Sequence, residues 1–227
     1  MALRAPKQEK NFTPQENLEP GSYPARVVRV YGAGTHPQVY MGEAKKPAFV
    51  LYVVYELVDA FMVDDNGNEL EDKPRWIMES FPLHSLESEN AKSTKRYLAI
   101  DPTKKHEGDW SKLIGEAVSV TVVNNAKDGK VYDNIGNTSA IRARDALKMP
   151  DLINEGFFFD PSEPNIEYFN KIPKFIQDKI KTSLDFAGSD LEKLISGAPA
   201  QKKEAPKKEE PEKDEEQDQD SDQNPWD

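Results

Sequence analysis

The sequence predicts a mainly β protein, in which a five-stranded barrel carries one helix between its third and fourth strands, a small helical extension and an acidic tail. Three observations predict it. β-branched and aromatic residues gather in five segments bounded by Gly, Pro, Asn and Asp, as in antiparallel strands. Helix formers fill the interval after the third segment and a stretch near residue 170. From Ala200 onward the 227-residue chain holds eleven acidic residues and five lysines.

The first strand is predicted over Gly21–Tyr31. Residues 23, 25 and 27 point to one face, whereas Val28 and Val30 follow the opposite parity. A β-bulge causes such a parity switch and allows one strand to bend between two halves of a barrel. The segment Gly32–Pro47 is interrupted by Gly and Pro and is expected to be a long, movable loop.

The second strand, Phe49–Val58, is apolar on both faces, which predicts a central strand that is buried on two sides. The segment Asp64–Asn68 has the residues of a hairpin turn and is expected to face solvent. A third strand follows over Arg75–Phe81, and Pro82 ends it. Ser85–Ile100 is rich in helix formers and predicts a short helix.

The fourth strand is predicted over Ala117–Asn124, where Val alternates with polar residues. A polar turn follows, and the fifth strand is predicted over Asn134–Arg142, weakened by Gly136. The order β-β-β-α-β-β with a bulged first strand is that of the five-stranded OB-fold barrel, whose strands 2 and 3 and adjoining loops bind oligonucleotides or oligosaccharides. A generic antiparallel sandwich is the alternative.

The chain therefore divides into four parts: a flexible arm (1–19), the OB-fold domain (20–145), a helical extension packed on the barrel (146–196) and a disordered acidic tail (197–227). In the extension, apolar residues recur at helical spacing over Asn165–Phe186, and Pro173 predicts two short helices instead of one. The aromatic residues here, including Phe157–Phe159, are predicted to be core.

The sequence gives no support to an enzyme. It has no Cys, so disulfides, thiolate metal sites and Cys nucleophiles are excluded. His36, His84 and His106 are isolated, and no Ser lies in a nucleophile elbow. We expect no cofactor and no metal. Because no apolar run has the length of a signal sequence or a membrane span, the expected location is the cytoplasm.

Binding of single-stranded nucleic acid is better supported, because such binders combine cationic side chains that follow phosphates with aromatic rings on which bases stack. The predicted barrel places both kinds of residue on the same strands and loops. The candidate nucleic-acid-binding residues are Arg29, Tyr31, Lys45, Lys46, Tyr52, Arg75, Trp76, Lys130, Tyr132 and Arg142. Tyr52 and Trp76 can equally be core residues of apolar strands.

The last fourteen residues, Asp214–Asp227, contain seven acidic residues and no basic one, and end in Pro225, Trp226 and Asp227. An acidic segment near a basic groove can compete with DNA for that groove. A Trp beside a terminal carboxylate suits a partner pocket with an apolar slot next to Arg or Lys. The candidate partner-binding residues are Asp220, Asp222, Pro225, Trp226 and Asp227.

Three stretches resemble the single-stranded DNA-binding proteins of tailed bacteriophages: LEPGSYPARVVRVY at Leu18–Tyr31, FVLYVVYELVD from Phe49, and the acidic C-terminus that closes on NPWD. The resemblance implies an OB-fold core that coats single strands in replication, recombination and repair within the host cytoplasm. It also implies an acidic tail that contacts replication proteins such as a polymerase, primase or helicase. The terminal aromatic here is Trp226, where Phe is more usual in the family.

Two alternatives stay open. A protein–protein adaptor built on an OB-like barrel, without nucleic-acid contact, agrees with the acidic balance of the chain. A homodimer could form through an edge strand or through the C-terminal helices.

Overall fold

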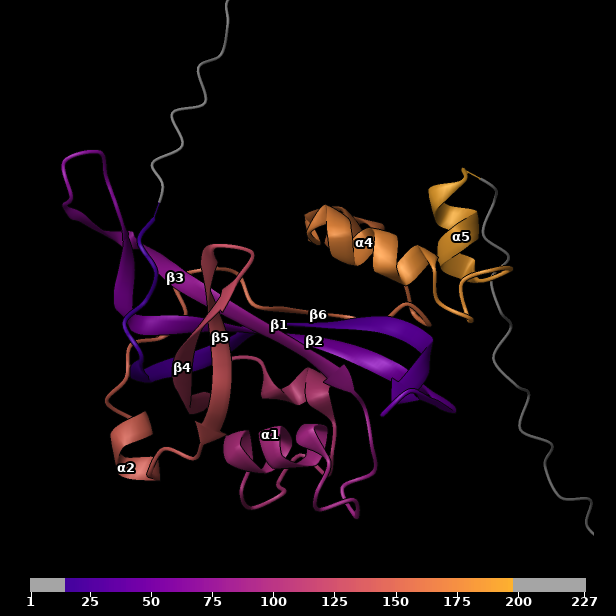
Figure 1. Ribbon diagram of the computed structural model, residues 1–227, viewed down its shortest axis with the longest axis horizontal. Helices are drawn as coiled ribbons and strands as arrows, with labels where there is room; N and C mark the ends of the chain where they lie inside the picture. Colours follow the sequence, from indigo (N-terminus) through magenta and orange to yellow (C-terminus); the bar gives the residue numbers. More distant parts are fainter. Residues whose placement is uncertain (1–14, 198–227) are drawn as a thin grey trace, which may run out of the picture.

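The computed structural model describes residues 15–197, and its largest part is a five-stranded antiparallel barrel (Figure 1). The strands are β1 (Gly21–Tyr40), β2 (Glu43–Val63), β3 (Glu69–Pro82), β4 (Ala117–Lys127) and β5 (Lys130–Ser139). They are hydrogen-bonded in the order β3-β2-β1-β4-β5, and β3 approaches β5 so that the barrel is nearly closed. Helix α1 (Lys92–Ile100) lies between β3 and β4 in the chain. The predicted OB-fold is confirmed.

Strand β1 pairs with three other strands. It runs antiparallel to β2 and β4, and parallel to the short strand β6 (Phe157–Phe159). Its register with β2 shifts between Val27 and Arg29, so Val28 is the bulged residue. Val27 and Val30 pack inside the barrel, whereas Val28 packs on the opposite side of the sheet. The parity switch in the sequence therefore predicted this bulge correctly.

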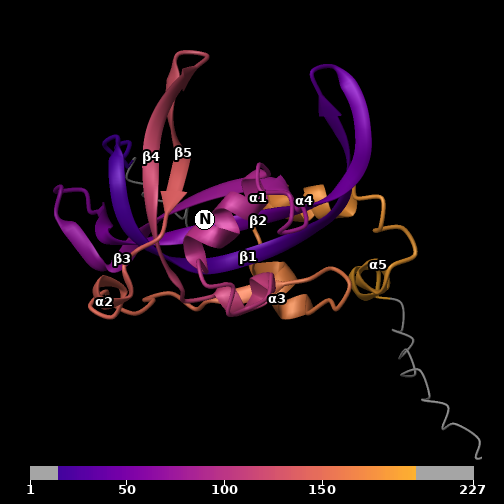
Figure 2. The ribbon, with the colours of Figure 1, turned by 90° about the horizontal axis from the view of Figure 1, so that it is seen from below.

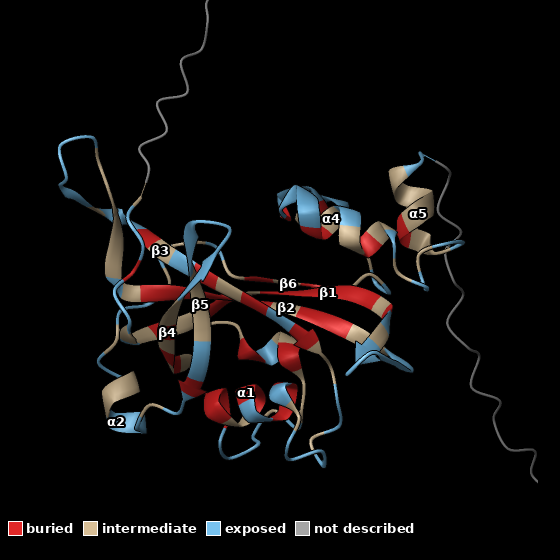
Figure 3. Ribbon diagram, viewed as in Figure 1, coloured by how far each residue is buried: buried red, intermediate tan, exposed pale blue. Residues whose placement is uncertain are grey.

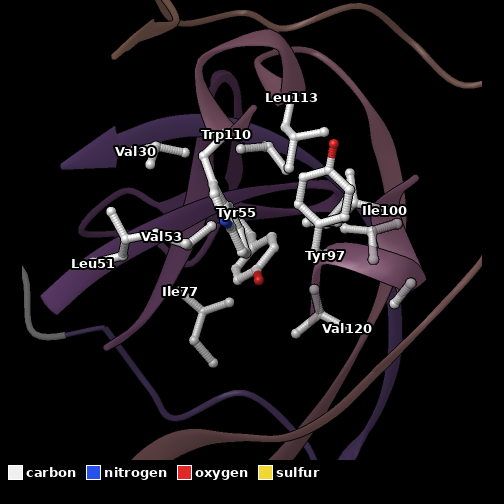
Figure 4. Packing of buried hydrophobic residues seen from close by; sticks show 14 of the residues in the cluster. Val30, Leu51, Val53, Tyr55, Ile77, Tyr97, Ile100, Trp110, Leu113 and Val120 are labelled. Carbon is white, nitrogen blue, oxygen red and sulfur yellow. The ribbon is translucent and has the colours of Figure 1, made fainter. Parts of the chain in front are cut away.

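The first core fills the barrel. Alternate residues of β2, Leu51, Val53 and Tyr55, point inward into the cluster that also contains Tyr97 of α1 (Figure 4). Trp110 of the short 3-10 helix η1 (Trp110–Leu113) packs edge-on against Tyr97, with ring centroids 5.4 Å apart. Full burial of an apolar side chain of this size contributes about 1.5–3 kcal/mol, so this cluster is a main source of barrel stability.

A second core covers the outer face of β1 and β2. The covering elements are β6, α3 (Ile166–Lys171), α4 (Lys174–Lys181) and α5 (Asp190–Ile195). Ile176 and Ile180 lie four residues apart on one side of α4 and are fully buried, and Ile172, just before Pro173, is buried with them. Buried residues lie both on α4 and along the strands (Figure 3). Pro173 is the N-cap of α4 and separates it from α3, as the sequence predicted. The core role predicted for Phe157–Phe159 is confirmed, since Phe157 and Phe159 are buried here.

The seam between β3 and β5 has no backbone ladder and is closed by side chains. Arg96 of α1 donates from Nε to Glu79 of β3 (2.8 Å) and from the other guanidinium nitrogens to Asn137 Oδ1 (3.1 Å) and the Gly136 carbonyl (3.4 Å) of β5. At the other end of the seam, Arg75 pairs with Asp133 at 3.3 Å. These side chains take the place of hydrogen bonds between the two edge strands.

Several predicted boundaries were wrong. The segment Gly32–Pro47, predicted to be a movable loop, continues β1 and β2 as a hairpin whose turn residues are Met41 and Gly42. Residues 15–19 of the predicted flexible arm pack on the barrel, where Leu18 is buried and its amide donates to Asp133. The helix predicted from Ser85 starts at Lys92.

The fifth strand begins and ends earlier than predicted, because it pairs with β4 from Lys130 to Ser139. Arg142 therefore lies beyond it, as the N-cap of α2 (Ala143–Ala146). Residues 1–14 and 198–227 lie outside the described residues. The candidate partner-binding residues Asp220, Asp222, Pro225, Trp226 and Asp227 belong to that part.

Candidate nucleic-acid interface

Two β-hairpins project from the same side of the barrel (Figure 2). The β1–β2 hairpin turns at Met41 and Gly42, and the β4–β5 hairpin turns at Asp128 and Gly129. All four residues have positive φ, between 51° and 80°, as a two-residue turn of type I′ requires. These hairpins flank the outer face of β2 and β3, where several of the candidate nucleic-acid-binding residues lie.

The second half of strand β3 extends from β5 to the β1–β2 hairpin. The middle of the strand passes beside β5, where Arg75 meets Asp133, and the strand ends at Pro82, which lines a hollow with Tyr40 and Lys46 of the β1–β2 hairpin. Its inward residues pack in the barrel, while Trp76, Met78 and Ser80 alternate with them and stay partly or fully exposed on the outer face. The outer face of β3 is thus a strip between two projecting hairpins.

Trp76 and Arg29 form the centre of this strip. The Arg29 guanidinium carbon lies 4.5 Å from the Trp76 ring centroid and 4.7 Å from that of Phe157, so it is held between two rings. Arg29 forms no ion pair with any carboxylate within residues 15–197, and its buried Nε has no hydrogen-bond partner there. Trp76, the outer of the two rings, is 38% exposed. A cation without a counter-ion therefore lies under an accessible indole.

The Trp76 ring is fixed by a hydrogen-bond network at its polar edge. Its Nε1 donates to Glu56 Oε2 at 3.2 Å. Glu56 is buried and also accepts from the backbone amides of Ile153 (2.7 Å) and Asn154 (3.3 Å). The loop that enters β6 thus saturates the Glu56 carboxylate, and the indole is positioned in advance of any ligand.

Tyr52 lies further along the same face. It is half-buried on β2, and burial raises the pKa of its phenol above the ordinary value while a hydrogen bond with Ser80 opposes that rise. Its ring meets Phe175 of α4 edge-on, with centroids 6.3 Å apart and an interplanar angle of 73°. Tyr52 is therefore neither wholly core nor freely exposed, and it keeps a protonated hydroxyl.

The hairpins carry the cationic candidates and one more ring. Lys45 and Lys46 are exposed on the β1–β2 hairpin, although Lys45 pairs with Glu43 at 2.6 Å. Lys130 and Tyr132 are exposed on the β4–β5 hairpin. The structure thus brings six of the ten candidate residues to the β2–β3 face and its hairpins, with Arg29 held beneath.

The other three candidates do not fit a DNA-facing role. Tyr31 is only 1% exposed, because β6 lies beside it and Phe157 packs on its ring at 5.6 Å. Burial raises the pKa of Tyr31, which a hydrogen bond with Arg29 opposes. Arg75 is engaged with Asp133 in the seam. Helix α2 lies on the side of the barrel opposite to the hairpins (Figure 2), and its N-cap Arg142 is exposed and pairs with Asp145 at 2.7 Å.

Sequence reasoning missed two rings of this surface. Phe157 was assigned to the core alone, yet it also forms the inner wall of the Arg29 sandwich. Phe175 was predicted to be core and is 57% exposed. A signal for Phe175 was present, since Ile172, Ile176 and Ile180 define the buried side of the helical pattern and residue 175 lies about 100° away from it.

Comparison with known proteins assigns no family to this chain. A scan against protein-family models finds no match to this chain, and a search of curated proteins finds no relative. Within residues 15–197 no group of His, Asp and Glu side chains is arranged to hold a metal ion. No helix in that range is long and apolar enough to cross a membrane. The chemistry that the strip offers is stacking and anion pairing.

Proposed function

We propose that this protein binds single-stranded DNA with little sequence preference and coats it during phage DNA replication, recombination and repair. The observation that carries the proposal is the accessible Trp76 ring on the outer face of β3, above the Arg29 guanidinium, which has no carboxylate partner within residues 15–197. A nucleobase stacked on an aromatic side chain contributes about 1–3 kcal/mol in complexes of this kind and needs no particular base. A guanidinium beside it supplies a partner for a phosphate.

The surrounding residues support the same proposal. Lys46 and Lys130 extend from the two hairpins, so cations stand on both sides of the aromatic strip. Tyr132 adds an exposed ring on the β4–β5 hairpin. The OB-fold itself binds ligands across strands 2 and 3 and the adjoining loops, which is a fold-level analogy and a weaker argument than the residues.

The proposed role of the tail rests on the sequence. Asp220, Asp222 and the terminal Pro225, Trp226 and Asp227 are proposed to recruit replication proteins. The acidic run would compete with DNA for the strip while DNA is absent.

A protein–protein adaptor is the second candidate, and two observations favour it. Residues 15–197 carry 22 Lys and Arg against 29 Asp and Glu, so the body is not a generally basic surface. The tip of the β1–β2 hairpin exposes Val39, Tyr40 and Met41, a small apolar patch that a protein could cover.

The deciding experiment is a fluorescence anisotropy titration of a labelled dT oligonucleotide, about 16 nucleotides long, at several salt concentrations. The wild-type chain should bind with an affinity that falls steeply with salt, because phosphate contacts release counter-ions. Trp76→Ala should weaken binding about 5- to 150-fold. Leu147→Ala, an exposed apolar residue next to α2, is the matched control and should bind as wild type does.

A second pair of titrations tests the tail. A chain that ends at Gly197 should bind the oligonucleotide more tightly than the full chain at low salt, because the acidic competitor is gone. If neither chain binds DNA at low salt, the DNA-binding proposal is refuted and the adaptor becomes the better account.

A further inference from the structure

The exposure of Phe175 has no explanation in the packing of α4. The helix is held on the sheet by Ile176 and Ile180, both of which are fully buried, together with Ile172 just before it. Phe175 is 57% exposed, and within residues 15–197 the ring against which it lies is that of Tyr52 of β2. A large apolar ring on the surface that fixes nothing in the fold suggests a contact surface.

The strand register places this ring pair on the same face as Trp76. Tyr52 pairs with Ser80 of β3, and Glu56 pairs with Trp76. Residues 76 and 80 lie on one side of β3 and are four residues apart, a separation of roughly 13 Å along the strand. The Tyr52–Phe175 pair therefore lies beside the far end of the strip, toward Pro82 and the β1–β2 hairpin.

We propose that Tyr52 and Phe175 form a second base-stacking platform, so that the C-terminal extension contributes directly to the binding of single-stranded DNA. The inference rests on the proposed function and adds to it a path for the ligand. One base stacks on Trp76 above Arg29, the strand follows β3, and a later unstacked base packs on Phe175, supported from the side by Tyr52. Lys45 and Lys46 lie where the strand then leaves the strip.

Edge-on support by Tyr52 fits this role. In a T-shaped pair the edge of one ring meets the face of the other, so Tyr52 covers at most one face of Phe175, and Phe175 is 57% exposed. The burial of Ile176 and Ile180 fixes the backbone of α4, so the ring is positioned before the ligand arrives.

The test measures anisotropy with a dT oligonucleotide of about 16 nucleotides and the full chain carrying single substitutions. Phe175→Ala should weaken binding at least about fivefold, and Phe175→Leu should weaken it similarly, because a side chain that is only apolar cannot stack. Phe175→Trp should retain the affinity, and the emission of the new indole should be quenched by DNA. Leu184→Ala is the matched control, at 58% exposure on the same extension, and should bind as wild type does.

The outcomes separate this inference from the proposal on which it rests. If Phe175→Ala binds as wild type does while Trp76→Ala has lost affinity, the second platform is refuted and the proposed function stands. Equal losses from Phe175→Ala and Leu184→Ala would also refute the platform, since the effect would not depend on the ring beside Tyr52. Absence of binding by the wild-type chain would refute both.

Discussion

Removing Arg96 should destabilise the barrel more than any other change in the β3–β5 seam. Arg96 and Glu79 are both almost fully buried, and their charged groups meet at 2.8 Å. Tyr55 also donates to Glu79, at 3.1 Å. Burial raises the pKa of Tyr55 well above its ordinary value, with further effect from the Glu79 charge, so its hydroxyl keeps the proton that it donates.

The expected cost of Arg96→Met is about 3 kcal/mol. Loss of one partner from a buried ion pair typically costs 3–5 kcal/mol, because the other charge is left buried. The lower end applies here since Lys92, whose side chain is 46% exposed, still reaches the other Glu79 oxygen at 2.8 Å. For a chain of this size a loss of 3 kcal/mol corresponds to a fall in Tm of about 6–12 °C.

Urea unfolding of three variants tests this reasoning. The double variant Glu79→Met/Arg96→Met should cost only about 1 kcal/mol, mainly for the Tyr55 hydroxyl, because no buried charge remains. Arg75→Met, at the other end of the seam, should cost about 1–2 kcal/mol, because both side chains of the pair are 18% exposed and the Leu18 amide still donates to Asp133. If the double variant were as unstable as Arg96→Met, or if Arg96→Met cost less than 1 kcal/mol, the seam would not depend on this buried pair.

Three further predictions concern glycines and pH. In urea titrations, Gly34→Ala should lower the free energy of unfolding by about 1–3 kcal/mol more than Gly42→Ala does. Both glycines have φ near +80°, but only at Gly34 would a Cβ meet Ser183, at 2.6 Å. Equal losses would mean that backbone strain explains the whole effect. Burial lowers the pKa of His36, so the unfolded chain binds a proton at this residue more tightly than the folded chain does. The free energy of unfolding should therefore fall as pH drops below about 6.5, and its dependence on pH should be flatter in His36→Gln. Burial raises the pKa of Asp101, but hydrogen bonds from backbone amides outweigh it and the pKa lies below its ordinary value. The stability that the Asp101 carboxylate contributes should therefore be complete above about pH 4 and be lost as pH falls through the depressed pKa. Unfolding followed by circular dichroism at low pH should show this loss in the wild-type chain and not in Asp101→Asn.

The barrel could be predicted because its signals are local. The parity switch at Val28 identified the bulge, and the apolar run Phe49–Val58 identified the central strand. Gly136 was interpreted as a weak point of the fifth strand and is a bulged residue, since Asn137 pairs with Thr121 while Ile135 pairs with Val122. In each case a short stretch of sequence carries the information.

The outer half of the β1–β2 hairpin could not be predicted because its glycines serve distant contacts. A Cβ at Gly32 would lie 2.9 Å from both Phe49 and Pro161, and one at Gly34 would collide with Ser183. These residues allow the C-terminal extension to approach β1 closely, but in the sequence they are indistinguishable from the glycines of a loop. Pro161 and Ser183, the contacts from the extension, lie more than 120 residues away in the chain.

The candidate site could be predicted only in part, for a similar reason. Arg29 and Tyr31 lie two residues apart on one face of β1, so sequence alone treats them alike. Both residues lie beside β6, but Tyr31 is buried in the second core while Arg29 is only partly buried, under the exposed Trp76 ring. Which of the two is accessible depends on where residues 157–159 dock, and no periodicity encodes that.

The bulge in β1 has a consequence for how the molecule unfolds. Val27 and Val30 pack in one core and Val28 packs in the other, while Phe158 of β6 packs against the core inside the barrel. Neither core can be lost without disturbing the strand that the other one needs. Barrel and extension should therefore melt in a single cooperative transition, and a chain cut after residue 145 would expose the apolar outer face of β1 and β2 and aggregate. We therefore expect the extension, although it follows the barrel in the sequence, to be part of the minimal folding unit.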